Sequence, residues 1–129
     1  MSVQTLSVML VDDDPYVADL FRLVLEHYDW NVVIATNADQ ALQYFKTASP
    51  DIVVLDLFLP DKDGYQTLLA MRALPEAESV LFVATTAYYT LDTQQEVLKH
   101  GFDGYMPKPF VPTDLAHDLL NFKQRGAAR

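Results

Sequence analysis

Short apolar runs recur along the chain and are separated by longer stretches of mixed character. Four of them, rich in β-branched residues, cover Val8–Val11, Val32–Ala35, Ile52–Leu55 and Val80–Ala84. Their apolar residues occupy consecutive positions, which is typical of strands that are buried on both faces of a sheet. A shorter stretch, Gly104–Met106, completes a set of five predicted strands.

The stretches between these runs carry the apolar spacing of amphipathic helices. Residues three and four positions apart lie on one face of a helix, so a repeat of this kind predicts an apolar stripe. The first, second and last predicted helices have the stripes Val17, Leu20, Phe21, Val24, Tyr28; Ala38, Ala41, Leu42, Phe45; and Leu115, Leu119, Phe122. A turn over Asp61–Gly64 leads into a third helix. The fourth, within Leu91–His100, has only three apolar anchors, Leu91, Val97 and Leu98, so we expect it to shift most easily.

Caps and loops agree with an alternation of strands and helices. Asp14 before Pro15 is a favourable start for the first helix, Asn37 can cap the second, and Pro112 can start the last. Such a βαβ alternation with short loops implies a parallel sheet with helices on both faces, joined by right-handed crossovers. We therefore predict an α/β fold: a single doubly wound, five-stranded parallel sheet with five helices. We expect residues 1–123 to form this domain and 124–129 to be a fraying end or the start of a linker.

Composition and charge narrow the class of protein. The chain has 129 residues, 50% of them hydrophobic, which is enough for one domain with its own core. It has no cysteine, which excludes disulfides, a thiol nucleophile and a thiolate metal site. The formal net charge of −9 argues against nonspecific nucleic-acid binding, since phosphate backbones require basic patches. The sequence shows no signal peptide and no membrane-spanning stretch, so we expect a cytoplasmic protein.

Acidic residues and one lysine follow three of the predicted strands. Asp12, Asp13 and Asp14 come directly after the first strand, Asp56 after the third, and Lys108 soon after the fifth. In an open parallel sheet, ligands bind beyond the carboxyl ends of the strands, so these side chains should converge. Clustered carboxylates need a compensating cation, and hard oxygen ligands favour Mg²⁺ bound together with a phosphate oxygen.

Two further residues complete a set of groups suited to phosphoryl transfer. Lys108 is a point charge on a flexible stem that can neutralise phosphate oxygens. Thr86 follows the fourth strand and offers a hydroxyl, with the small Ala87 beside it. A nucleophile, a metal and fixed donors for the equatorial oxygens are the parts that this chemistry requires.

Other polar patterns have plainer explanations. An EF-hand interpretation of Asp61–Gly64 fails because Leu59 stands at the first ligand position and Ala70 at that of the closing glutamate. The three histidines lack metal-ligand spacing and are expected at the surface. Trp30 is expected to be a packing residue away from the acidic cluster.

Four segments, in the same order along the chain, resemble the receiver domain of bacterial two-component response regulators, which has a CheY-like, flavodoxin-like fold. They are Val11-Asp12-Asp13-Asp14-Pro15, Leu55-Asp56-Leu57-Phe58-Leu59-Pro60-Asp61-Lys62-Asp63-Gly64, Thr85-Thr86-Ala87 and Gly104-Tyr105-Met106-Pro107-Lys108-Pro109-Phe110. The similarity extends from about Ser7 to Phe122 and implies the strand order 2-1-3-4-5. Any one motif is weak evidence, whereas four in order are strong.

The resemblance implies a role for each matching residue. Asp56 would accept a phosphoryl group from a sensor histidine kinase or a histidine phosphotransfer protein. Lys108 would contact the phosphoryl group, with a cis Lys108–Pro109 peptide bond. Four groups would hold Mg²⁺, or Mn²⁺ in its place: the side chains of Asp12, Asp13 and Asp56 and the backbone carbonyl of Phe58.

The resemblance also implies a switch. Thr86 would move toward the phosphoryl oxygens and Tyr105 would rotate inward behind it, changing the face formed by the fourth helix, fifth strand and fifth helix. That face would control an output domain or a downstream protein, and a phosphorylation-dependent homodimer stays open.

The resemblance further implies which surface meets the kinase: the exposed face of the first helix and the loop after Lys108 would select it. The domain would catalyse only its own aspartyl phosphorylation and dephosphorylation, so it would not be an enzyme in the usual sense. It would contact neither nucleic acid nor a membrane.

Two residues are unusual for their positions: Phe58, two residues after Asp56, and Tyr89, three residues after Thr86. Tyr88, two residues after Thr86, is also bulky and aromatic. In this family, side chains at the positions of Phe58 and Tyr88 flank the route of the hydrolytic water. Neither ring can orient water as an acid or an amide would. We therefore expect a comparatively long-lived phosphorylated form.

Three other functions stay open on the residues alone. An aspartyl-phosphate hydrolase requires an Asp-x-Asp-x-Thr/Val loop, whereas Asp14 is followed by Pro15 and Tyr16. A flavodoxin-like nucleotide-binding protein requires a loop rich in Gly, Ser and Thr, and three aspartates in its place would repel a phosphate. A receiver-like fold used only for constitutive protein binding is less favoured, because all the candidate phosphorylation residues are present.

Overall fold

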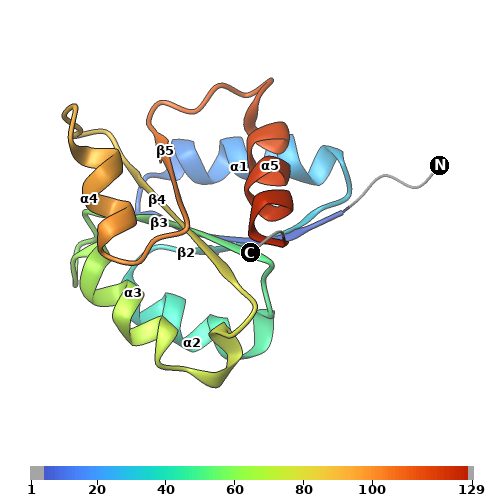
Figure 1. The fold of residues 1–129 in the computed structure, drawn as a ribbon. Coiled ribbons are helices and arrows are strands. Elements are labelled where there is room, and N and C mark those ends of the chain that lie inside the picture. Colours follow the sequence, from blue (N-terminus) through green and yellow to red (C-terminus); the bar gives the residue numbers. More distant parts are fainter. Residues whose placement is uncertain (1–4, 128–129) are drawn as a thin grey trace.

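The computed structural model describes residues 5–127, in which five parallel strands alternate with five α-helices. The strands are β1 Ser7–Val11, β2 Asn31–Ala35, β3 Ile52–Asp56, β4 Leu81–Thr86 and β5 Gly104–Pro107. The helices are α1 Pro15–His27, α2 Ala38–Ala48, α3 Gly64–Arg72, α4 Thr93–Lys99 and α5 Leu115–Ala127, with a 3₁₀ turn at Pro75–Ala77. Figure 1 shows one twisted sheet, and its strand order β2-β1-β3-β4-β5 confirms the predicted one. Within the described residues, no helix has the length and apolar character needed to cross a membrane.

Each strand supplies side chains to two separate cores, one on each face of the sheet. Along β3, Ile52 and Val54 belong to one core, and Val53 and Leu55 belong to the other. Helices α1 and α5 cover the first face, and α2 and α3 cover the second (Figure 1). Trp30 is only 3% exposed and belongs to the core beneath α1 and α5, which confirms it as a packing residue. The consecutive apolar positions of the strands therefore correspond to a doubly wound sheet, as predicted.

The ends of several elements differ from the predicted ones. Strand β4 begins one residue later than predicted, since the N–H of Val80 donates to the carbonyl of Ala77 in the preceding turn. It also runs on through Thr86, which pairs with Pro107 of β5. Helix α5 begins at Leu115 and not at Pro112, because residues 112–114 form a turn.

Helix α4 is held even more weakly than the sequence indicated. Of its three expected anchors, Val97 is buried, whereas Leu98 is 45% exposed and Leu91 is fully exposed. The prediction that Leu91 and Leu98 anchor this helix is therefore wrong. Leu91 lies ahead of the helix, which begins at Thr93, so it faces solvent.

At the end of the chain, the helix continues past the boundary that was expected at residue 123. Helix α5 includes residues 124–127, so this part of the expected tail is helical. Ala128 and Arg129, the remainder of that tail, lie outside the described residues, as do residues 1–4 at the start of the expected domain.

Aspartate and asparagine side chains fix the starts of three helices. Asp14 accepts a hydrogen bond from the N–H of Tyr16 in α1, and Asn37 caps α2 as predicted. Asp63 accepts from the N–H of Gln66 in α3, so the turn interpretation of this segment is confirmed. Asp61 accepts from the first two N–H groups of α2, which lowers the pKa of its carboxyl. The loop after β3 is thereby tied to two helices.

We expect Asp63→Ala to lower the free energy of unfolding by about 1 kcal/mol, because α3 would lose its side-chain cap. Asp92→Ala is the matched control, since Asp92 precedes α4 without making a side-chain cap hydrogen bond. Urea unfolding of the two variants and the wild type measures the difference. Equal losses in both variants would contradict the assignment.

Candidate functional site

The carboxyl ends of β1, β3 and β5 bring acidic residues and a lysine to one edge of the sheet. Asp12 directly follows β1 and is 1% exposed, and Asp56 is the last residue of β3 and is 6% exposed. Asp13 lies beside them and is exposed. One carboxylate oxygen from each of the three lies within 4.8 Å of the other two. The segments that the sequence predicted to converge therefore do so.

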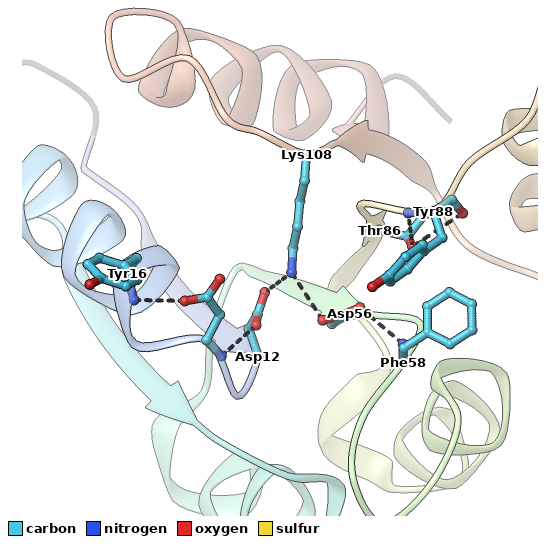
Figure 2. Close-up of polar contacts among 8 residues, drawn as sticks. Asp12, Tyr16, Asp56, Phe58, Thr86, Tyr88 and Lys108 are labelled. Atoms are coloured by element: carbon cyan, nitrogen blue, oxygen red, sulfur yellow. Dashed lines mark hydrogen bonds and ion pairs between the residues drawn. The ribbon is translucent and has the colours of Figure 1, made fainter.

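Lys108 reaches into this cluster from the loop after β5. Its Nζ lies 2.6 Å from Oδ2 of Asp12 and 3.1 Å from Oδ2 of Asp56, as Figure 2 shows. Burial by itself would favour the neutral amine, but the bonds and charges of Asp12 and Asp56 outweigh it and raise the pKa of Lys108. The lysine therefore stays positively charged between the two carboxylates. The peptide bond from Lys108 to Pro109 is cis, as the resemblance implied.

Asp12 is the most buried carboxylate of the site. Burial raises the pKa of Asp12, although Lys108 and the N–H of Asp14, which donates to Oδ1 at 2.9 Å, partly offset this effect. The negative charge of Asp56 raises the pKa further. A second cation close to these oxygens would relieve this unfavourable charge.

Asp56 is held by the backbone of the loop that follows it. Its Oδ1 accepts a hydrogen bond from the N–H of Phe58 at 3.0 Å, and its Oδ2 faces Lys108. Gly64 allows α3 to begin directly against this loop. A Cβ atom at Gly64 would lie 2.6 Å from Cα of Leu57 and 2.9 Å from the carbonyl oxygen of Asp56, which is too close. A glycine is therefore required here by close approach of the backbone.

The donor set fits a hard divalent cation. Three carboxylates offer oxygen atoms in one small space, and the turn after Asp56 places the backbone of Phe58 next to them. Mg²⁺ prefers oxygen ligands and is usually held by one or two carboxylates with water and phosphate. The cluster here has the composition that such binding requires.

Thr86 and Tyr105, the two residues of the expected switch, lie on neighbouring strands. Thr86 is fully buried, and its Oγ1 accepts a hydrogen bond from the N–H of Tyr88 at 3.0 Å. Tyr105 of β5 pairs with Ala84 of β4. Its hydroxyl oxygen is buried without a hydrogen-bond partner among the described residues, and burial raises its pKa. In this structure the Thr86 hydroxyl thus binds the backbone of the loop that follows β4.

An aromatic contact at the mouth of the site was missed by the sequence reasoning. The rings of Phe58 and Tyr88 meet edge to face, with centroids 5.5 Å apart and an interplanar angle of 85°. Their residues are 58% and 78% exposed. The sequence singled out each position separately. Because the two residues stand on different loops, no local pattern indicates that their rings touch.

Comparisons with known proteins agree on one family. The family model described as the response regulator receiver domain matches residues 8–120. A 14.6 kDa protein of Leptolyngbya boryana is 36% identical over 116 residues, which is 88% of each chain. The transcriptional regulatory protein TrcR of Mycobacterium tuberculosis is 33% identical over 120 residues, covering 93% of this chain and 46% of TrcR. The chain thus spans about half the length of TrcR.

A solved structure shows the same architecture. The CheY-like response regulator receiver domain protein from Methanospirillum hungatei superposes with a TM-score of 0.83 at 25% identity, covering 97% of this chain and 98% of that one. The strand order, the acidic cluster and the lysine after β5 are in keeping with this likeness. The chain therefore belongs to the response regulator receiver domain family and acts in phosphorelay signal transduction.

Proposed function

We propose that Asp56 is the phosphoacceptor of this receiver domain. The observation that carries the proposal is the position of its carboxylate at the end of β3, facing the Lys108 amine at 3.1 Å and within reach of Asp12 and Asp13. A carboxylate oxygen of Asp56 attacks the phosphorus of a phosphohistidine on a kinase or phosphotransfer protein. The phosphorus–nitrogen bond breaks, the imidazole leaves and takes up a proton, and an aspartyl phosphate forms. The domain is not a classical enzyme, and we propose that it promotes only this step and its hydrolysis.

The neighbouring groups are suited to stabilising the charge of that reaction. We assign Asp12, Asp13, Asp56 and the backbone carbonyl of Phe58 as the groups that hold Mg²⁺, with Mn²⁺ as an alternative. Bound there, the cation supplies positive charge to the phosphoryl oxygens. Lys108 neutralises the same oxygens from the other side, since contacts with carboxylates keep it protonated.

Thr86 and Tyr105 form the switch in this proposal. Phosphorylation offers Thr86 oxygen acceptors that compete with its present bond to Tyr88. As Thr86 turns toward them, Tyr105 moves behind it, and the surface of α4, β5 and α5 changes. Weak anchoring of α4 through Val97 alone supports this assignment, because a weakly packed helix shifts at low cost. We propose that this surface controls an output domain or partner protein, or a phosphorylation-dependent homodimer.

The partner that supplies the phosphoryl group has a surface to dock on. A cavity of 520 Å³ opens between α1 and the loop after β5, with Tyr16, Leu20, Lys108 and Phe110 among its lining residues. Tyr16 is 84% exposed on the first turn of α1. We propose that a histidine kinase or phosphotransfer protein binds here, because the cavity reaches the lysine that contacts Asp56. A cytoplasmic location is part of the same proposal.

Incubation with acetyl phosphate and Mg²⁺ should add a single phosphoryl group, which intact-mass spectrometry detects. Asp56→Asn should abolish the adduct, because an amide oxygen is a poor nucleophile, and EDTA should abolish it in the wild type. Asp14→Asn is the matched control, since asparagine also caps helices well and Asp14 lies outside the acidic cluster. An adduct that persists in Asp56→Asn would overturn the assignment.

Mg²⁺ should stabilise the folded protein through the acidic cluster. At ten times its dissociation constant, the ion should add roughly 1.4 kcal/mol to the free energy of unfolding. Asp13→Asn should remove most of this gain, because it deletes a ligand that makes no ion pair with Lys108. Urea unfolding with and without Mg²⁺ gives the values, and Asp14→Asn should respond like the wild type. An unchanged response in Asp13→Asn would exclude Asp13 as a ligand.

The Phe58–Tyr88 pair should lengthen the life of the aspartyl phosphate by restricting the approach of water. Phe58→Ala and Tyr88→Ala should each hasten its hydrolysis, roughly tenfold, which corresponds to about 1.4 kcal/mol in the barrier. The decay of the phosphoryl adduct after removal of acetyl phosphate measures the rate. Tyr44→Ala, which removes an exposed tyrosine of α2, should leave the rate unchanged. A lifetime of seconds that neither truncation alters would contradict this role.

A further inference from the structure

A separate cavity opens beside the phosphoacceptor loop, between the start of α3 and α4. It has a volume of 410 Å³, which lies within the range of cavities that hold ligands. Three aromatic residues, Phe58, Tyr65 and Tyr88, and two acidic residues, Asp63 and Glu96, are among those that line it. Figure 2 shows Phe58 and Tyr88 lying together beyond Asp56, so the cavity borders the proposed phosphorylation site.

The aromatic rings lie in two pairs. Phe58 and Tyr88, from the loops after β3 and β4, meet edge to face. Tyr65 of α3 packs against His100 at the end of α4 in a tilted arrangement, with centroids 4.4 Å apart and an interplanar angle of 40°. The faces and edges of four rings from four different segments therefore surround one space.

The charge in this cavity is negative. None of the described lining residues is a lysine or an arginine, and Asp63 and Glu96 both contribute carboxylates. Burial raises the pKa of the Tyr65 hydroxyl, and the charges of Glu96 and Asp63 raise it further. A further negative charge beside the two carboxylates is thus disfavoured at this point, and a positive charge is favoured.

Stability of the fold does not account for the two outer rings. Tyr88 is 78% exposed and Phe58 is 58% exposed, so both leave apolar surface in contact with water. Asp63 does have a structural role, because its Oδ1 caps α3. Asp63 is an exposed residue, and the half-exposed carboxylate of Glu96 lies 3.9 Å from Nδ1 of His100.

We propose that this cavity binds an arginine side chain of a partner polypeptide. A guanidinium stacks on aromatic faces and bonds to carboxylates through its planar fork, so it matches both features of the lining. Charge complementarity favours a basic partner, since the chain carries a net charge of −9. The cavity beside α1 is a poorer site for a cation, because Lys108 forms part of its lining.

Occupation of the cavity has a consequence that rests on the proposed function. The N–H of Tyr88 donates to Oγ1 of Thr86, so a ligand that fixes Tyr88 also biases the switch. By linkage, the factor by which phosphorylation changes the partner's affinity equals the factor by which the bound partner changes the equilibrium constant of phosphorylation. The binding itself can be measured on the unphosphorylated protein, so its failure is distinguishable from a failure of phosphorylation.

Titration of the unphosphorylated protein, in EDTA, with the peptide acetyl-Gly-Arg-Gly-amide tests the inference. Amide NMR shifts should saturate at peptide concentrations on the order of millimolar, and should cluster at Phe58, Tyr65 and Glu96. The control peptide carries citrulline, which has the shape of arginine without its charge, and should bind more weakly by about fivefold or more. Equal binding of the two peptides, or shifts confined to Asp12 and Asp13, would overturn the proposal.

Matched variants locate the binding site. Glu96→Gln should weaken the arginine peptide by about twofold to fivefold, whereas Glu26→Gln, which removes the same charge from an exposed position on α1, should not. Tyr88→Ala should weaken it as well, and Tyr16→Ala, a similarly exposed tyrosine at the other cavity, should not. If Glu26→Gln or Tyr16→Ala weakens the arginine peptide and Glu96→Gln and Tyr88→Ala do not, the peptide binds elsewhere and the proposal is overturned.

Discussion

The site is organised around the ion pairs of Lys108 with Asp12 and Asp56. The sheet buries both carboxylates at one edge, and burial alone raises the pKa of Asp12. The lysine at 2.6 Å and 3.1 Å provides the positive charge that keeps such a cluster compatible with a folded state. A divalent cation and a phosphoryl group would add charges of both signs here. In the proposed reaction, the flexible stem of the lysine would let it move its contact from a carboxylate to a phosphoryl oxygen.

In the parallel sheet, the relative positions of these residues depend on the register in which neighbouring strands pair. Asp56 pairs with Thr85 of β4, and Thr86 pairs with Pro107, one residue before Lys108. Neighbouring strands lie about 4.8 Å apart, so residues at these ends face one another at fixed spacing. Gly64 then lets α3 start against the loop after Asp56 without displacing it. Asp56 and Thr86 are therefore positioned by backbone pairing within the sheet, and Lys108 follows directly after β5, where its N–H donates to the carbonyl of Thr86.

The sequence predicted the elements of the fold correctly where the local pattern of apolar residues matches the residues that are buried. Consecutive apolar residues such as Ile52 to Leu55 predicted strands with two covered faces, and these residues alternate between two cores. Features that depend on tertiary contact could not be predicted in this way. Leu91 has an apolar side chain but precedes the helix it was expected to anchor, and the contact between Phe58 and Tyr88 joins two loops. The positions of the acidic residues were predictable because strand ends share one edge, whereas the bond from Thr86 to Tyr88 was not.

A continuous chain of contacts links the two sides of the proposed switch. Asp56 accepts from the N–H of Phe58, the Phe58 ring meets Tyr88, and the N–H of Tyr88 donates to Thr86. A phosphoryl group on Asp56 would compete for both ends of this chain, since it changes the acceptor of Phe58 and attracts Thr86. Breaking the Thr86 bond frees the loop that leads into α4, which only Val97 anchors in the core. A charge at Asp56 would thus act on α4, the helix with the weakest packing against the core. A small free-energy change is enough to shift such a helix between two positions, as the proposed switch requires.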